Sequence, residues 1–260
     1  GLFIFDSIKL LLVSLYTMKK NNYMNSAGAS IMSDHTISVI TDYLHLEQKI
    51  GGYESMIEKS TEFDLFYQRA AKLINAPSVD EIAFTDGGSR GWNTLINSLD
   101  LSLIDSFITI SSEYLTNITT LQLCAQKNGK KLHVIPCSLK GDFDINTLQE
   151  LANTDRACIA ISQATAQGSI TNPIYQIGKI AKATNSIYIV DATQSVGQIP
   201  IDVQAIQCDA LTATGRKWLR GPRGTGFIYV RKGASFTTNS VDGSSSKAYK
   251  IGGTIIVEKI

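Results

Sequence analysis

The sequence alternates short apolar runs with segments of helical periodicity, and this alternation constrains the fold more than any other feature. Runs of four or five apolar residues, many of them β-branched, are typical of strands buried on both faces, as in a parallel sheet covered by helices. We expect seven strands, at residues 81–84, 107–110, 133–136, 158–162, 187–190, 210–214 and 226–230. Helices are expected at 37–50, 54–75, 89–99, 115–128, 145–152 and 173–184, with Pro77 ending the second of them. This order predicts a doubly wound α/β domain with a mostly parallel sheet.

Composition narrows the classes of protein that fit the chain. Its 260 residues suffice for one large domain, or for one domain with a short appendage. The 24 Lys and Arg residues balance 23 Asp and Glu residues, so we expect neither a nucleic acid nor a membrane surface as partner. The four cysteines have no metal-like spacing to the three histidines, which predicts reduced cysteines in a cytoplasmic protein and no metal site.

The first 17 residues, GLFIFDSIKLLLVSLYT, form the one candidate targeting segment. Asp6 and Lys9 interrupt its apolar run, which is too short to span a bilayer. Lys19 and Lys20 follow this run, whereas a secretory signal carries its positive charge before the apolar core. We therefore interpret the segment as an upstream extension and assign no function to it.

Polar residues follow five of the expected strands. Ligands of open α/β sheets bind beyond the carboxyl ends of the strands, so these residues indicate where a site would form. The five segments are TDGGSRGW, SSEYLTN, QATAQGS, DATQ and GRKW.

The segment TDGGSRGWN at 85–93 leads from a strand into a helix through Gly87, Gly88 and Ser89. Backbone N–H groups and the positive end of a helix dipole would face one point there, which suits a phosphate group. An ordinary helix cap is the alternative. Neither G-x-G-x-x-G nor G-x-x-x-x-G-K-[ST] occurs in the chain, so a dinucleotide fingerprint and a P-loop are both excluded.

Asp191 and Lys217 are the two candidate charged groups of the site. Asp191 follows four apolar residues, and a carboxylate with so little water needs a partner such as a pyridinium nitrogen, an arginine or a backbone cap. Gln194 could donate to the same ligand, although Asp191 could also be a simple helix cap. Cationic neighbours favour the amine form of Lys217, which suits Schiff-base chemistry, whereas the alternative is a solvated basic loop.

A phosphate cradle, a strand-end carboxylate, a glutamine and a later lysine are together the parts that pyridoxal 5′-phosphate (PLP) requires. Their order and context, above all DALTATGRKWLRGPRGTGFIYV at 209–230, resemble the class V aminotransferase family of fold-type I PLP enzymes. This family includes cysteine desulfurases, selenocysteine lyases and isopenicillin-N-epimerase-like proteins. The resemblance runs from about Tyr23 to about Val230. It implies a three-layer PLP-binding large domain at 23–235, an N-terminal extension at 1–22, and a remnant or start of a C-terminal small domain at 236–260.

By position, the resemblance implies a role for each candidate residue. Lys217 would form the internal aldimine, Asp191 would pair with the pyridine nitrogen, and Gln194 would approach the phenolic oxygen of the cofactor. Tyr114 stands where the family usually stacks a histidine on the ring. The residues implied to hold the phosphate are Gly88, Ser89, Thr214 and Arg216.

Other positions match the family pattern only in part. Glu113 and Asn117 match the family's E-x-x-x-N pattern, and Thr165 and Gln167 lie near the expected cofactor position. Arg216 replaces the histidine that the family often has before the lysine. The arginine that would anchor a substrate carboxylate is not found, and no cysteine follows Cys208 to carry a persulfide.

The resemblance implies a PLP-dependent enzyme in which Lys217 removes the α-proton of an amino acid. We expect a lyase or desulfurase-like reaction on a sulfur-containing amino acid; a class V aminotransferase or epimerase, or a truncated non-catalytic PLP-fold protein, are the alternatives. A homodimer is implied because family sites form between subunits, with residues 23–50 helping to line them. Nucleic-acid binding through RKWLRGPRG is disfavoured by the nearly neutral charge.

Overall fold

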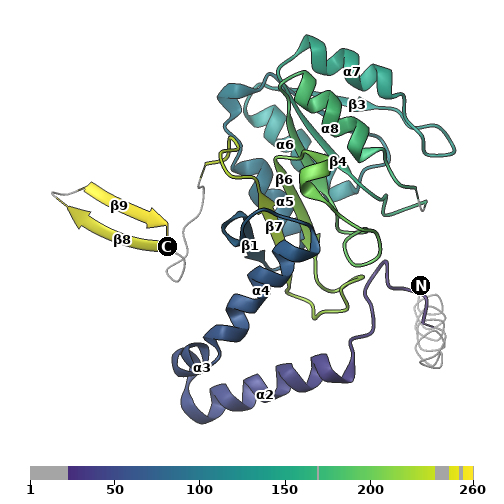
Figure 1. Cartoon of the computed structure of the whole chain (residues 1–260). Coiled ribbons are helices and arrows are strands. Elements are labelled where there is room, and N and C mark those ends of the chain that lie inside the picture. The colour runs from purple at the N-terminus through teal and green to yellow at the C-terminus, as the bar shows by residue number, and fades with distance from the viewer. Residues whose placement is uncertain (1–22, 169, 238–245, 252–253, 260) are drawn as a thin grey trace, which may run out of the picture.

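A computed structural model describes residues 23–168, 170–237, 246–251 and 254–259 of the chain. Its centre is a seven-stranded sheet with helices on both sides (Figure 1). The strands lie side by side in the order β1 (Ile82–Thr85), β7 (Gly226–Val230), β6 (Ala210–Thr214), β5 (Ile187–Asp191), β4 (Ala157–Ser162), β2 (Ser106–Ile110) and β3 (Lys131–Ile135). Strand β7 is antiparallel to β1 and β6, and the other neighbours are parallel. The predicted seven-stranded, mostly parallel sheet is confirmed.

Side chains alternate between two cores because successive residues of a strand face opposite sides of the sheet. Ile159 and Ile161 of β4 belong to one core, and Cys158 and Ala160 belong to the other. Helices α4 (Ser60–Leu73), α7 (Ile145–Thr154), α8 (Ile174–Ala183) and α9 (Val203–Ile206) cover the first core. Helices α5 (Gly88–Asn97) and α6 (Leu115–Lys127) cover the second. The fold thus has three layers, as expected.

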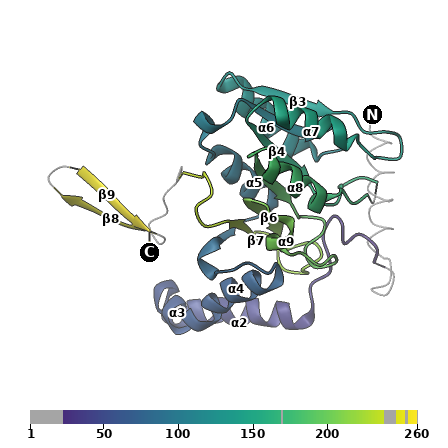
Figure 2. The same cartoon turned by 45° about the horizontal axis from the view of Figure 1, so that its top comes forward.

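The helices before the sheet form an arm, built from α2 (Asp34–Ile50), α3 (Gly52–Glu58) and α4 (Figures 1 and 2). The prediction of one helix across 54–75 is wrong at Lys59, whose backbone (φ −102°, ψ 15°) separates α3 from α4. Packing explains the division. Helix α4 buries Ala70 and Ala71 in the core, whereas α3 buries only Ser55, so the two segments follow different directions.

Two further features were not predicted from the pattern. The four-residue helix α9 is too short for a periodicity signal. Strands β8 (Ser246–Ile251) and β9 (Thr254–Lys259) pair as an antiparallel hairpin. Phe236 forms a bridge with Leu99, and the Thr237 amide donates to the Ser98 carbonyl oxygen at 2.6 Å. The domain boundary expected at 235/236 stays a prediction, and residues 1–22 lie outside the described residues.

In the described part of the chain, no helix combines the length and the apolarity that crossing a membrane requires.

We expect Gly178→Ala to destabilise the domain. A Cβ atom at residue 178 would lie 1.8 Å from the carbonyl oxygen of Ile206, so α8 would have to move away from α9. Overpacking of this kind costs about 1–3 kcal/mol. Urea unfolding would measure the loss, with Lys179→Ala on the exposed face of α8 as control, expected to stay within about 0.5 kcal/mol of wild type. Equal unfolding midpoints for both variants would contradict the close packing of α8 on α9.

Candidate functional site

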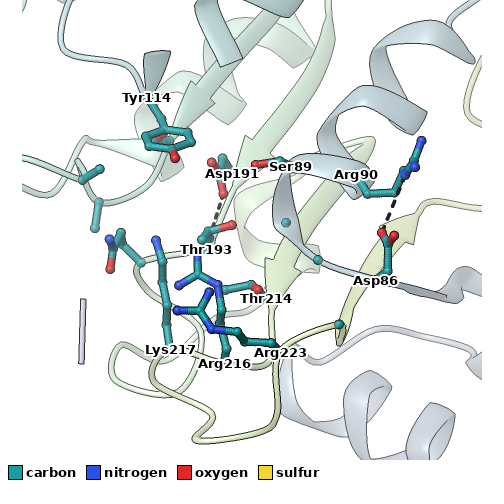
Figure 3. Close-up of a pocket in the computed structure, with 17 residues that line it drawn as sticks. Asp86, Ser89, Arg90, Tyr114, Asp191, Thr193, Thr214, Arg216, Lys217 and Arg223 are labelled. Carbon is teal, nitrogen blue, oxygen red and sulfur yellow. Dashed lines mark hydrogen bonds and ion pairs between the residues drawn. The ribbon is translucent and has the colours of Figure 1, made fainter. Parts of the chain in front are cut away.

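The carboxyl ends of the central strands open into a cavity of about 310 Å³ (Figure 3). This volume is at the lower end of the range for small-molecule sites. All eight residues expected at the cofactor line it: Gly88, Ser89, Tyr114, Asp191, Gln194, Thr214, Arg216 and Lys217. Their assignment to a cofactor stays a prediction, but the structure brings them to one place. The Tyr114 ring lies on one side of the cavity and Arg216 and Arg223 on the other, with Lys217 pointing between them (Figure 3).

The start of helix α5 forms one wall of the cavity. Gly87 is the N-cap of α5 and makes no side-chain capping bond, so the first N–H groups of the helix are not capped by that residue. A Cβ atom at Gly87 would meet no atom within 4 Å, which shows open space beside it. A Cβ atom at Gly88 would lie 2.5 Å from Thr193 Oγ1, so the glycine allows α5 to approach the loop after β5. Uncapped N–H groups beside open space form an anion-binding site.

Lys217 is buried, with 7% of its surface exposed, and lies in the loop between β6 and β7. Burial lowers the pKa of its amine, the charge of Asp191 opposes this, and the charge of Arg216 lowers it further. The net direction is downward, which increases the share of neutral amine at a given pH. A neutral amine is the nucleophilic form of lysine.

Asp191 ends strand β5 and has both carboxylate oxygens hydrogen-bonded. Oδ1 accepts from the Thr193 amide at 2.8 Å, and Oδ2 accepts from Asn117 Nδ2 at 2.7 Å. The backbone cap considered in the sequence analysis therefore exists, together with a side-chain donor. The carboxylate still lines the cavity, where a cationic or N–H group of a ligand could reach a remaining lone pair.

Gln194 is held in one orientation by two partners. Its Oε1 accepts from the Trp218 indole N–H at 3.0 Å, and its Nε2 donates to the Ala27 carbonyl oxygen at 3.1 Å. Because the indole only donates, it fixes which end of the amide is oxygen. Nε2 keeps a second hydrogen for an acceptor.

The segment before α2 is attached to the same loops. Arg216 donates to the Gly28 carbonyl oxygen, the Ser30 amide donates to the Arg216 carbonyl oxygen at 2.8 Å, and Arg220 donates to Ile31 at 3.1 Å. The segment at residues 28–31 thus lies against the loop that carries Lys217.

Several cavity residues were not among the predicted ones. Arg223 lies in the basic segment GPRG that the sequence analysis could also interpret as a solvated loop, and Thr193 and Ser162 have no motif of their own. Asp86 and Arg90 form an exposed pair at 3.7 Å, with the i, i+4 spacing as their only signal. Ala164 and Ala166 line the cavity, whereas Thr165 and Gln167 do not. Among the described residues, no three His, Cys, Asp or Glu side chains gather as a possible metal site.

We expect Lys217 to react with acetic anhydride at lower pH than an ordinary lysine, whose pKa is about 10.4. Removing the negative charge in Asp191→Asn should lower the pH midpoint further, and removing the positive charge in Arg216→Met should raise it. Peptide mass spectrometry after pulse labelling measures the midpoint. The exposed Lys179 shows that the reagent is active, and a Lys217 labelling midpoint no lower than that of a free lysine amine would contradict the lowered pKa.

Known proteins of one family are similar to this chain in sequence. A sequence model of the family described as aminotransferase class-V matches residues 22–253. A cysteine desulfurase from Serratia proteamaculans is 33% identical over 178 residues, which are 67% of this chain and 44% of that protein. One from Shigella sonnei is 31% identical over 216 residues, 81% of this chain and 53% of that protein. The chain thus spans about half the length of these relatives.

Solved structures show the same fold. The apo cysteine desulfurase from Thermococcus onnurineus has a TM-score of 0.82 at 22% identity, covering 91% of this chain and 60% of that chain. A structure of C-DES, with glycine covalently linked to its PLP cofactor, has a TM-score of 0.80 at 20% identity. This match covers 90% of this chain and 63% of that chain. The match of the family model over most of the sequence is decisive: the chain belongs to the class V aminotransferase family of PLP-dependent enzymes.

Proposed function

We propose that this chain carries the PLP-binding site of an enzyme that acts on an amino acid, with a desulfurase-like lyase reaction on a sulfur-containing amino acid. One observation carries the proposal: a buried lysine with a lowered pKa and the carboxylate of Asp191 line the same cavity as the uncapped start of α5. The names of the relatives, cysteine desulfurases, support the substrate class.

The residues of the cavity fit PLP by their chemistry. The phosphate is anionic, and α5, Thr214 and Arg216 offer N–H groups, a hydroxyl and a guanidinium. The pyridine nitrogen is basic, and Asp191 offers a buried carboxylate. The aldehyde needs an amine, which Lys217 provides.

When bound, PLP withdraws electrons from the α-carbon of an amino acid and so makes its α-proton acidic. The chain's own residues do the rest. Lys217 would hold the cofactor through its amine, and its Nζ atom would be the acceptor for the α-proton. Asp191 would keep a proton on the ring nitrogen, Tyr114 would pack against the ring, and Gln194 would donate from Nε2 to the phenolic oxygen.

Trapping with borohydride tests this proposal. Purified protein is incubated with PLP, reduced, digested and analysed by mass spectrometry. We expect the reduced pyridoxyl group on Lys217. Protein without an adduct, or with an adduct on exposed lysines alone, would mean that the chain is a non-catalytic PLP-fold protein, as considered above.

Transamination or epimerisation is the second candidate for the reaction at this site. All four cysteines of the sequence are free thiols, three of them buried, and none lines the cavity. A persulfide step needs a thiolate near the substrate sulfur, whereas neither transamination nor epimerisation needs a thiol. Incubation with cysteine distinguishes these reactions, because a desulfurase-like lyase releases sulfur, whereas an aminotransferase leaves the pyridoxamine form of the cofactor and an epimerase yields the D-amino acid.

We also propose that the protein is a homodimer that works in the reducing cytoplasm. Helix α2 has 17 residues and buries none of them, and large apolar side chains on the arm are exposed, among them Val39 (53%), Leu44 (57%) and Ile57 (71%). Exposed apolar surface of this kind is typical of an interface. The free cysteines agree with a reducing compartment.

A charged side chain introduced on the arm tests whether the arm forms the dimer interface. We expect wild type to sediment as a dimer and Leu44→Glu to shift it toward monomer, because burying an unpaired carboxylate in an interface is costly. Leu123→Glu is the matched control, since Leu123 is equally exposed (62%) but lies on α6. Monomeric wild type, or equal dissociation in both variants, would contradict an interface at α2.

A further inference from the structure

A second buried carboxylate lies behind Asp191. Glu113, in the loop between β2 and α6, is 7% exposed and does not line the cavity. Asn117 Nδ2 lies 3.0 Å from Glu113 Oε1 and 2.7 Å from Asp191 Oδ2. The two hydrogens of one amide group therefore bridge two carboxylates. Strands β2, β4 and β5 are adjacent in the sheet, which brings the three side chains and Ser162 to one edge.

Every hydrogen-bond partner of Glu113 is a donor. Besides Asn117, Oε1 accepts from the Tyr114 amide at 2.9 Å and from the Ser162 hydroxyl, and Oε2 accepts from the Ser162 amide at 2.6 Å. A carboxylate satisfies four donors without supplying a hydrogen, which no neutral side chain of this shape can do. Capping the start of α6 would need only one acceptor oxygen. Glu113 accepts from four donors, so its hydrogen bonds go beyond capping of α6.

No positively charged side chain is among the neighbours named here for Glu113, so its charge is not balanced next to Asp191. Glu113 faces Asp191 from β5, and its other neighbours, Tyr114, Asn117 and Ser162, are neutral. The charge of Asp191 acts on both Glu113 and Lys217, and the charge of Arg216 acts on Lys217. Burial raises the pKa of Glu113, and the charge of Asp191 raises it further, while the hydrogen bonds from Ser162 and Tyr114 oppose this. Two adjacent buried carboxylates favour a cation at the open side of Asp191.

We propose that Glu113 is a positioning residue that acts on the cofactor through Asn117 and Asp191. It holds Asn117, whose amide group fixes Oδ2 of Asp191, and it adds a second negative charge behind the Asp191 carboxylate. The added charge keeps the ring nitrogen protonated to higher pH than Asp191 alone. This inference rests on the proposed function.

The test uses PLP labelled with ¹⁵N in the ring, bound to the full chain. The ¹⁵N chemical shift reports the protonation of the ring nitrogen as the pH is raised. In Glu113→Gln we expect deprotonation at a pH lower by about one to two units, the Coulomb interaction of charges roughly 6–10 Å apart at an effective dielectric constant near 20. The difference appears only above the pKa of Glu113, because below it wild type is also neutral at this position.

Two further variants separate charge from packing. Glu113→Asp keeps the charge but shortens the side chain and loses hydrogen bonds, so it should titrate close to wild type. Thr109→Val removes the buried bond from Thr109 Oγ1 to the Ala160 carbonyl oxygen (2.8 Å) without a change of charge, and should also titrate as wild type. A merely structural Glu113 predicts the reverse order, with Glu113→Gln close to wild type and Glu113→Asp more disturbed.

The outcomes distinguish this inference from the proposed function. If wild type gives no borohydride-trapped adduct at Lys217, the proposed function fails and the inference fails with it. If the adduct forms and folded Glu113→Gln titrates with wild type, only the role of Glu113 is overturned.

Discussion

Lys217→Ala should abolish the covalent PLP adduct and the exchange of a substrate α-proton with solvent. No other described lysine lines the cavity, so no second amine can take its place. Borohydride trapping measures the adduct, and NMR of an amino acid in D₂O measures the exchange. The expected loss is complete for the adduct, and for the exchange on the order of the 10²- to 10⁴-fold that a positioned general base contributes, or more.

Two variants sharpen this test. Lys217→Arg keeps a positive charge and most of the volume but has no amine that is neutral near pH 7, so it should fail as Lys217→Ala does. Lys179→Ala removes an exposed lysine and should keep full adduct formation. An adduct that survives in Lys217→Ala at wild-type yield would show that PLP reacts with the surface and not at this site.

The sheet could be predicted from the sequence because its strands are buried on both faces. Strands β2, β4 and β6 have every residue buried, so each is a continuous apolar or small-residue run. The edge strands β1 and β3 are partly exposed, and their predicted bounds are shifted by one to two residues. The division at Lys59 could not be predicted, because it depends on where α4 meets the core.

Part of the site could be predicted because several of its residues directly follow strands. Parallel strands bring their carboxyl ends to one edge, so residues that follow strands, such as Asp191, meet there. Glu113 and Asn117 matched a pattern, but the amide bridge between two carboxylates depends on the order of β2, β4 and β5 in the sheet, which periodicity does not contain. The place of Arg223 at the cavity could not be predicted for another reason. A basic loop that lines a site and a basic loop that faces solvent have the same sequence pattern.

Asp191→Asn should separate cofactor attachment from catalysis. The asparagine is neutral and cannot hold a proton on the ring nitrogen, so the electron withdrawal that acidifies the α-proton is weakened. Removing one partner of a buried charge pair costs about 3–5 kcal/mol. We therefore expect α-proton exchange to fall on the order of 10²- to 10⁴-fold. The adduct at Lys217 should persist, because loss of the Asp191 charge lowers the pKa of Lys217 further and so favours its neutral amine.

The role of Asp191 is identified by a loss of α-proton exchange while the adduct at Lys217 persists. Asp191→Ala should resemble Asp191→Asn, since both lack the charge. Asp105→Asn is the matched control, because Asp105 precedes β2 at the opposite edge of the sheet and pairs with Arg156 at 2.6 Å on the surface. Loss of adduct and exchange in equal measure would mean that Asp191 serves the shape of the cavity, since a purely structural defect does not spare attachment. Full exchange in Asp191→Asn would remove Asp191 from the reaction, because an amide cannot replace the charge that the ring nitrogen needs.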